Sequence, residues 1–386
     1  MDLSYIINHL GEEREQYQYS VSPPIFESSN FTFPSVAAMR QQIPNEQNHP
    51  FYTRGYNPTV AILRKKLAAL EKADDALVFA SGSAAISAAV MGNIKANEHI
   101  ICVKNPYSWT KKLITNNLVH FGVTASYIDG TAVENFEAAI QPNTKIIFLE
   151  SPNSFTFEQQ DITAVCALAK KHNILTIVDN SYASPLNQNP IEMGADIVVH
   201  SASKYICGHS DLVAGLLCAN QAMINKLFTT QYMNNGGIIH PHSAWLLIRS
   251  LRTLPLRMER VGATTMKVVS YLYQHPKVAK VHFPFIKENP QYELTKKQLR
   301  YPSGQFSIEL KTEETAKIEQ FCDSLKRFLL ACSWGGHESL IFPITALNDS
   351  NNYGQNPYPN NLIRFYVGLE DADILIEDLK QALDKI

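Results

Sequence analysis

The chain has 386 residues, of which 45% are hydrophobic and 18% are charged, and 34 Lys and Arg against 36 Asp and Glu give a net charge of −2. This balance excludes the large positive field of proteins that bind nucleic acid or anionic membranes. The composition is that of a globular protein and excludes a disordered or fibrous chain. The length predicts a sizeable core, divided between two domains.

Residues 1–50 are rich in Pro, Asn, Gln and aromatic side chains. Such a segment cannot form a core alone, so it is either disordered or packed on a partner subunit, and its aromatic content favours packing. We therefore predict an N-terminal arm that lies on a neighbouring subunit. The chain has no apolar run of about 18 residues, which predicts no membrane-spanning helix and a cytoplasmic protein.

Residues 51–235 alternate between helical patterns and short apolar runs. A helix is expected over 59–70, where apolar residues recur at helical spacing. Runs that are apolar on both faces predict buried parallel strands in a doubly wound α/β domain, whose ligands bind beyond the carboxyl ends of the strands. The predicted strands are 76–80, 99–103, 145–150, 174–179 and 196–201.

Residues 236–386 have a different character and predict a smaller α+β domain. A long helix is expected over 244–275 and a closing helix over 371–386. Between them, residues 304–310 and 362–369 are strand-like.

The cysteines predict neither a disulfide framework nor a zinc site, because they lie far apart with no C-x-x-C pair. We expect all of them to be reduced and buried, and a redox role for Cys207 is the weaker alternative. His240 and His242 lack carboxylate or cysteine neighbours at ligand spacing, so a loop beside the site entrance is favoured over a metal pair. The six cysteines are Cys102, Cys166, Cys207, Cys218, Cys322 and Cys332.

Three turns that follow predicted strands carry candidate site residues. In the first, Ser81-Gly82-Ser83 leads from a strand into a helix of small residues, where exposed N–H groups suit a phosphate; a tight turn without a ligand is the alternative. In the second, Asp179 ends the apolar run 174–179 and must be paired or hydrogen-bonded. A helix cap would also satisfy this carboxylate.

The third turn places Lys204 beside Ser201 and Ser203 after another apolar run. Desolvation there would lower the pKa of the amine and make it a usable nucleophile, although an exposed loop lysine is also possible. A phosphate cup, a buried carboxylate and an activated lysine are together the parts that hold pyridoxal phosphate, in which the protonated ring nitrogen makes the cofactor an electron sink.

Six ordered segments resemble the cystathionine synthase and lyase family of pyridoxal-phosphate enzymes of Cys/Met metabolism, over nearly the whole chain. This resemblance implies the aspartate-aminotransferase-like fold (fold type I): a mostly parallel sheet with helices on both faces and a smaller C-terminal α+β domain. The segments are YTRGYNPT (52–59), SGSAAI (81–86), VDNSY (178–182), HSASKYICGHSD (200–211), SWGGHESL (333–340) and LIRFYVGLED (362–371).

The resemblance implies that Lys204 is the Schiff-base lysine and the acid/base that moves protons on the substrate. It also implies that Asp179 pairs with the pyridinium nitrogen and that Tyr107 stacks on the ring. Tyr52 and Arg54 match a pair that reaches the phosphate bound by a neighbouring subunit, which implies at least a dimer and usually a tetramer. The residues that line the phosphate are Gly82, Ser83, Ser201 and Ser203.

Arg364 matches the arginine that grips the substrate α-carboxylate, with Ser333 beside it and Trp334 walling the pocket. An arginine inside an apolar strand is expected to bind an anion. That anion could be the substrate or, alternatively, a carboxylate of the protein in a structural ion pair. Glu338 could contact the far end of the substrate or lie in solvent.

Within the family, the resemblance favours bacterial cystathionine β-lyase, which converts L-cystathionine to homocysteine, pyruvate and ammonia. Ser154 stands where γ-type enzymes usually carry Asn, and Trp334 replaces the usual leucine. Residues 52–59 and 81–86 look more like γ-synthase and γ-lyase, so these activities, methionine γ-lyase-like activity included, are the alternative. A catalytically silent protein of the same fold is disfavoured because every position needed for cofactor chemistry is filled.

Overall fold

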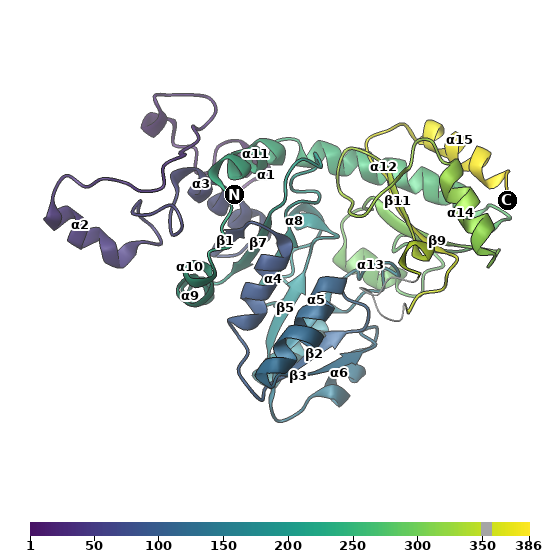
Figure 1. The fold of residues 1–386 in the computed structure, drawn as a ribbon, viewed down its shortest axis with the longest axis horizontal. Helices are drawn as coiled ribbons and strands as arrows, with labels where there is room; N and C mark the ends of the chain where they lie inside the picture. The colour runs from purple at the N-terminus through teal and green to yellow at the C-terminus, as the bar shows by residue number, and fades with distance from the viewer. Residues whose placement is uncertain (349–356) are drawn as a thin grey trace.

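The computed structural model describes residues 1–348 and 357–386, which form two sheets with their helices (Figure 1). The larger sheet has seven strands in the order β1-β7-β6-β5-β4-β2-β3, and only the pairings of β7 are antiparallel. Its strands are β1 (Asp75–Phe79), β2 (His99–Val103), β3 (Thr124–Ile128), β4 (Thr144–Glu150), β5 (Leu175–Asp179), β6 (Ile197–Ser201) and β7 (Gly215–Ala219).

Helices cover both faces of this sheet. One face packs on α4 and α9, and the other packs on α3 and α11 at one end and on α6 and α7 at the other. The helices of this domain are α3 (Pro58–Glu71), α4 (Gly82–Met91), α5 (Ser108–Lys112), α6 (Val133–Ala139), α7 (Ile162–Lys171), α8 (Ser184–Asn187), α9 (Gln221–Leu227), α10 (Met233–Asn235) and α11 (Pro241–Leu251).

The parallel register brings the carboxyl ends of the central strands together. Glu150, the last residue of β4, is the direct partner of Asp179, the last residue of β5. Both side chains point to the α4 face, because each continues the alternation of a residue in the core beneath that helix, Phe148 and Ile177. In sheets of this kind, ligands bind beyond the carboxyl ends of the strands, so this edge is the place to look for a site.

The smaller sheet has the order β10-β11-β12-β9-β8 and is covered by α12, α14 and α15 around its own core. Its strands are β8 (Val278–His282), β9 (Gln305–Leu310), β10 (Leu329–Leu330), β11 (Leu340–Pro343) and β12 (Leu362–Tyr366). Its helices are α12 (Leu254–Tyr273), α13 (Tyr292–Gln298), α14 (Thr315–Ser324) and α15 (Ala372–Leu383).

The helix predicted over 244–275 is wrong as a single element. The structure divides it at Arg252 and Thr253, between α11 and α12. Pro255 is the cause, because proline fits the first turn of a helix but would break an interior turn.

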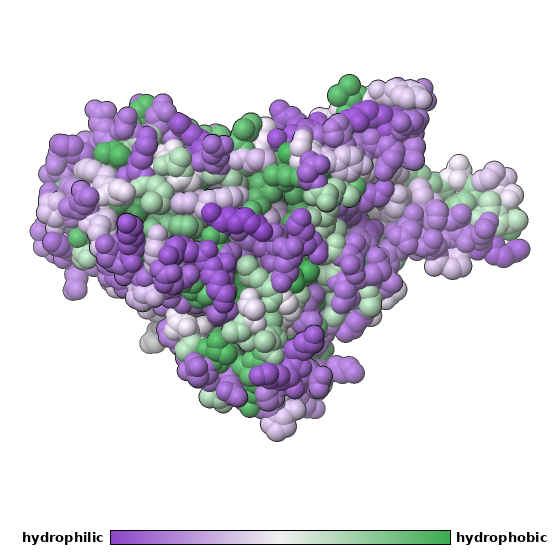
Figure 2. Space-filling view, turned by 180° about the vertical axis from the view of Figure 1, so that it is seen from behind, coloured by the Kyte–Doolittle hydropathy of each residue, from purple (hydrophilic) through white to green (hydrophobic). Residues whose placement is uncertain are grey.

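The N-terminal segment has two parts. Its first helix, α1 (Leu3–Asn8), packs on its own chain, with Ile6 and Ile7 in the core beside α3. The part that carries α2 (Val36–Gln42) stands away from the body of the molecule in both views (Figures 1 and 2). Val36 is 72% exposed and Ile43 is 48% exposed on this projecting part. That the arm packs on a neighbouring subunit stays a prediction.

Five of the six cysteines are buried as predicted, but Cys332 is exposed, because it lies in a turn between β10 and β11 instead of in a core element. All six are free. Among the described residues, no helix combines the length and the apolar composition needed to cross a bilayer.

Candidate functional site

Lys204 lies in the turn that follows β6, with its side chain directed at a loop of the smaller domain. Its Nζ donates to Ser333 Oγ at 2.5 Å and lies 5.4 Å from the centre of the Trp334 ring. Burial, and after it the charge of Arg364, lowers the pKa of Lys204 to about 8. The amine is therefore partly neutral near pH 8, which is the state that a nucleophile or a base needs.

Asp179 is buried, with 7% of its surface exposed. Its Oδ1 accepts from the Ser181 N–H at 3.0 Å, whereas α8 begins only at Ser184, so Asp179 does not cap that helix. Burial raises the pKa of Asp179, and hydrogen bonds from Ser181 and the charges of His200 and Lys204 oppose this rise. A cation placed against this carboxylate would keep it ionised.

The turn from β1 into α4 approaches β6 closely. Ser81 caps α4 by accepting from the Ala84 N–H at 3.1 Å. A Cβ on Gly82 would lie 2.9 Å from Ser201 Cβ, and one on Gly215 would lie within 2.1 Å of Ser81 O, so only glycine fits at either position. The structure thus brings Gly82 and Ser201 together at the N-terminus of a ten-residue helix, which suits an anion.

The remaining predicted phosphate residues differ in their surroundings. Ser83 is exposed on the first turn of α4. The hydroxyl of Ser203 accepts from the Ala214 N–H at 2.9 Å and donates to the Ala214 carbonyl at 3.2 Å, so it also braces the loop before β7. The Ser201 N–H donates to Ser181 Oγ at 2.7 Å, which links this turn to the one after Asp179.

Tyr107 immediately precedes α5 and is 40% exposed. Its backbone N–H donates to Glu150 Oε2 at 2.6 Å, while Glu150 Oε1 accepts from Ser154 Oγ at 2.7 Å. Glu150 was not among the predicted site residues. Its position at the end of a buried strand, like that of Asp179, was the signal that could have identified it.

Arg364 comes from the middle of β12 in the smaller domain. Its Nη2 donates to the Ser333 carbonyl at 3.0 Å, and its guanidinium lies over the Phe155 and Phe342 rings at 5.2 and 5.3 Å. Burial lowers the pKa of Arg364 to about 10. The described residues place no carboxylate at ion-pair distance from it, so the structural ion pair considered as its alternative is not formed there.

The loop that carries Ser333 and Trp334 packs on the lysine turn. Gly335 adopts φ +88°, and a Cβ there would lie 2.8 Å from Lys204 Cα, so glycine is needed for this close approach. Glu338 accepts from the Ser210 hydroxyl with both carboxylate oxygens, at 2.7 and 2.8 Å, and so ties the two turns together.

Neither Tyr52 nor Arg54 has a contact with Lys204 among those the structure describes. Tyr52 forms an isolated bridge with Asn30, and the Arg54 guanidinium lies 5.3 Å from the Tyr52 ring centre. Both side chains are exposed. His240 pairs with Glu27 of the arm at 3.4 Å, and in the described parts of the chain no group of three metal-ligating side chains gathers.

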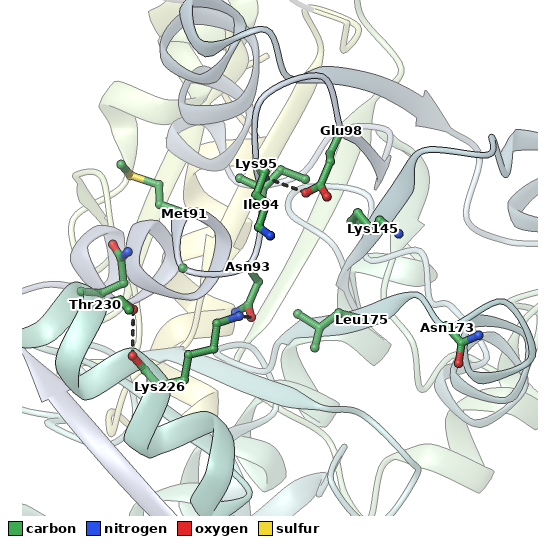
Figure 3. Close-up of a pocket in the computed structure, with 12 residues that line it drawn as sticks. Met91, Asn93, Ile94, Lys95, Glu98, Lys145, Asn173, Leu175, Lys226 and Thr230 are labelled. Carbon is green, nitrogen blue, oxygen red and sulfur yellow. Dashed lines mark hydrogen bonds between the residues drawn. The ribbon is translucent and has the colours of Figure 1, made fainter.

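A hollow of about 450 Å³ lies at the opposite edge of the larger sheet (Figure 3). Lys145 and Leu175 line it from the starts of β4 and β5, and Lys95 and Glu98 line it from the loop before β2. It holds none of the predicted site residues, and we assign it no role in the reaction.

The residues at the carboxyl edge fit pyridoxal phosphate. Asp179 offers a buried carboxylate for a ring nitrogen, and Lys204 offers an amine with a lowered pKa. The space kept free by Gly82 beside Ser201 offers a cup at a helix N-terminus for a phosphate. Arg364 and the Ser333 loop leave a cationic site for a carboxylate next to the amine.

Comparisons with known proteins agree with this chemistry. Residues 5–384 match the family described as Cys/Met metabolism PLP-dependent enzyme. An L-methionine gamma-lyase from Pseudomonas deceptionensis is 34% identical over 381 residues, covering 97% of this chain and 95% of that protein. An L-alanine/L-glutamate racemase from Wolbachia pipientis is 35% identical over 392 residues, covering 99% and 96%.

The crystal structure of metB from Corynebacterium glutamicum superposes with a TM-score of 0.91 at 34% identity, covering 100% of this chain and 98% of that one. This likeness confirms the predicted fold class, and the family match confirms the predicted cofactor. The chain belongs to the family of pyridoxal-phosphate-dependent enzymes of Cys/Met metabolism.

Proposed function

We propose that this enzyme is a carbon–sulfur lyase of sulfur amino acids and that its preferred reaction is β-elimination from L-cystathionine. The overall reaction consumes water, breaks the Cβ–S bond and yields homocysteine, pyruvate and ammonia. The observation that carries this proposal is the placement of the Lys204 amine between Ser333 and Trp334, beside Arg364.

Each of these residues has a distinct task. Arg364 binds the α-carboxylate of the amino acid, since a planar fork of donors matches a carboxylate. Lys204 attaches the cofactor and then takes the α-proton on Nζ, for which a pKa of about 8 is suitable. Asp179 keeps a proton on the ring nitrogen by its negative charge. The cofactor, when bound, supplies the electron sink that makes the α-proton acidic.

Two features support β- over γ-elimination. γ-Elimination requires a second deprotonation at Cβ, and therefore a base that can move between two carbons. Nζ donates to Ser333 Oγ and lies 5.4 Å from the centre of the Trp334 ring, which packs in turn on the Tyr205 ring at 5.4 Å. Ser154, where γ-type enzymes carry Asn, donates its hydroxyl to Glu150. This arrangement suits a Lys204 amine that takes a proton from one carbon only, as β-elimination requires.

γ-Elimination is the second candidate, because the Pseudomonas deceptionensis relative is an L-methionine gamma-lyase. The test is to incubate the purified enzyme with L-cystathionine and separately with L-methionine and to identify the keto acid by mass spectrometry. Pyruvate from cystathionine with no product from methionine is the expected result. 2-Oxobutyrate from either substrate would overturn β-elimination and support γ-elimination.

We also propose that the enzyme works in the cytoplasm as a homo-oligomer, at least a dimer and by analogy a tetramer. The projecting arm with its exposed Val36 and Ile43 supports a subunit contact, as do the exposed Tyr52 and Arg54, which would reach the phosphate bound by a neighbour. Light scattering on the holoenzyme tests the assembly. A monomer that retains full activity would contradict it.

A further inference from the structure

Glu150 and Asp179 form a pair of buried carboxyl groups at the end of the larger sheet. They are register partners on adjacent parallel strands and point to the same face, so their Cβ atoms lie about 5 Å apart. Each is 7% exposed. Burial and the charge of Asp179 both disfavour the ionised form of Glu150.

The two carboxyl groups have different surroundings. Asp179 has the Lys204 amine and His200 acting on it, both of which favour its charged form. The charge of Asp179 on β5 acts on Glu150. Glu150 in turn acts on Cys102 on β2 and on Tyr358, and Lys111 on α5 also acts on Cys102. The largest effects on Glu150 are burial and the charge of Asp179, which raise its pKa to about 8, and none of the principal effects comes from a cation. If only one of the two carboxyl groups is ionised, it is therefore Asp179.

The contacts of Glu150 extend to both sides of the cofactor site. Oε2 accepts from the N–H of Tyr107, the residue that leads into α5. Oε1 is hydrogen-bonded to the hydroxyl of Ser154. A hydroxyl can donate to an ionised carboxyl or accept from a neutral one, so this contact is compatible with either state of Glu150. The next residue, Phe155, lies against Arg364. One carboxyl group thus fixes the segments that carry Tyr107 and Phe155.

We propose that Glu150 is a positioning residue that works as a neutral carboxyl, holding Tyr107 and the Ser154 loop around the cofactor while Asp179 carries the negative charge. This role rests on the family's cofactor and not on whether the Cβ–S or the Cγ–S bond is broken. It is therefore independent of the test of β- against γ-elimination.

The experiment compares Glu150→Gln with Glu150→Ala, using apoenzyme titrated with pyridoxal phosphate and the pH dependence of the absorbance of the bound cofactor. Glutamine keeps the size and neutrality of the carboxyl and an oxygen acceptor for Tyr107. We expect its cofactor affinity and absorbance midpoint to match the wild type. Alanine removes the carboxyl oxygen that accepts from the Tyr107 N–H, and we expect it to weaken cofactor binding about tenfold.

Ser154→Ala is the matched control, since it removes one partner of Glu150 and leaves the carboxyl in place. We expect it to weaken cofactor binding less than Glu150→Ala does. Thermal unfolding of each apoenzyme separates loss of the site from loss of the fold. If Glu150→Gln shifts the absorbance midpoint or weakens binding as much as alanine, the charge of Glu150 is required and the proposal is wrong. Wild-type affinity in Glu150→Ala would also overturn it.

Discussion

The Nζ of Lys204 lies 2.5 Å from the Oγ of Ser333, which follows it by 129 positions in the chain. Lys204 belongs to the turn after β6 of the larger sheet, and Ser333 belongs to the loop before β11 of the smaller sheet. The contact joins the domain proposed to hold the cofactor to the domain proposed to bind the substrate carboxylate.

Replacing Lys204 with alanine should remove the covalent link to the cofactor. We expect the purified protein to lose the yellow colour of the wild type, and its turnover should fall by at least about 10²–10⁴-fold because the proton-transfer group is also lost. Absorbance spectra and keto acid release measure the two effects. A variant that keeps both the colour and the turnover would show that another amine is the nucleophile.

The lowered pKa of Lys204 predicts the pH dependence of cofactor attachment. Only the neutral amine attacks an aldehyde, so the rate at which apoenzyme takes up pyridoxal phosphate should rise with pH and level off above about 8. An ordinary lysine would keep the rate rising toward its usual pKa of 10.5. Stopped-flow absorbance across this range tests the prediction.

Arg364 contributes to that lowered pKa, after burial. In Arg364→Gln the plateau of the attachment rate should therefore move to higher pH, because a nearby positive charge is gone. An unchanged plateau would assign the whole effect to burial.

Arg364 should also determine the affinity for the amino acid, and the cofactor should stay attached when Arg364 is replaced. We expect Arg364→Leu to raise KM about 10²-fold, as expected when one partner of a buried charge pair is removed, while the cofactor absorbance stays unchanged. Arg364→Lys should recover only part of this loss, since an ammonium lacks the planar fork of a guanidinium. Steady-state kinetics decide, and a change in kcat alone would refute carboxylate binding.

A buried ion pair anchors the N-terminal segment. Lys66 Nζ lies 3.0 Å from Glu12 Oε1, with side-chain exposures of 0% and 2%, and also donates to the Ile6 and Ile7 carbonyls. Glu12→Ala would leave a buried ammonium without its counter-charge, and we expect it to lower the free energy of unfolding by about 3–5 kcal/mol.

The neighbouring pair of Lys65 and Glu13 is the control for that variant, because its side chains are 56% and 46% exposed. We expect Glu13→Ala to leave the unfolding midpoint in urea nearly unchanged. Equal destabilisation in the two variants would mean that burial of the Glu12 pair is not what matters.

The strands that the sequence predicted are those with an unbroken apolar pattern. β2 and the central strands β4, β5 and β6 begin and end within one residue of the predicted bounds. Strands buried on both faces are apolar throughout, and this pattern can be recognised without knowing which strands lie beside them. β3 was not predicted, since it lies at the edge of the sheet and is only partly buried. β7 was also missed, although residues 215–219 form a short, fully buried apolar run of the same kind.

The sequence pointed to Lys204 and Asp179 because each follows such a strand, and the structure places both at the same edge of the sheet. It could not show that the Ser203 hydroxyl braces Ala214, or that Glu338 binds Ser210, since these contacts depend on the packing of loops. It also missed Glu150, whose significance comes from the register of β4 against β5.

The division of the site between two sheets has an evolutionary consequence. Lys204 and Asp179 lie at the ends of strands in one core, whereas Arg364 belongs to a strand in another. With the roles proposed above, substitutions around Trp334 in the smaller domain would change which amino acid is accepted and leave the residues that hold the coenzyme untouched.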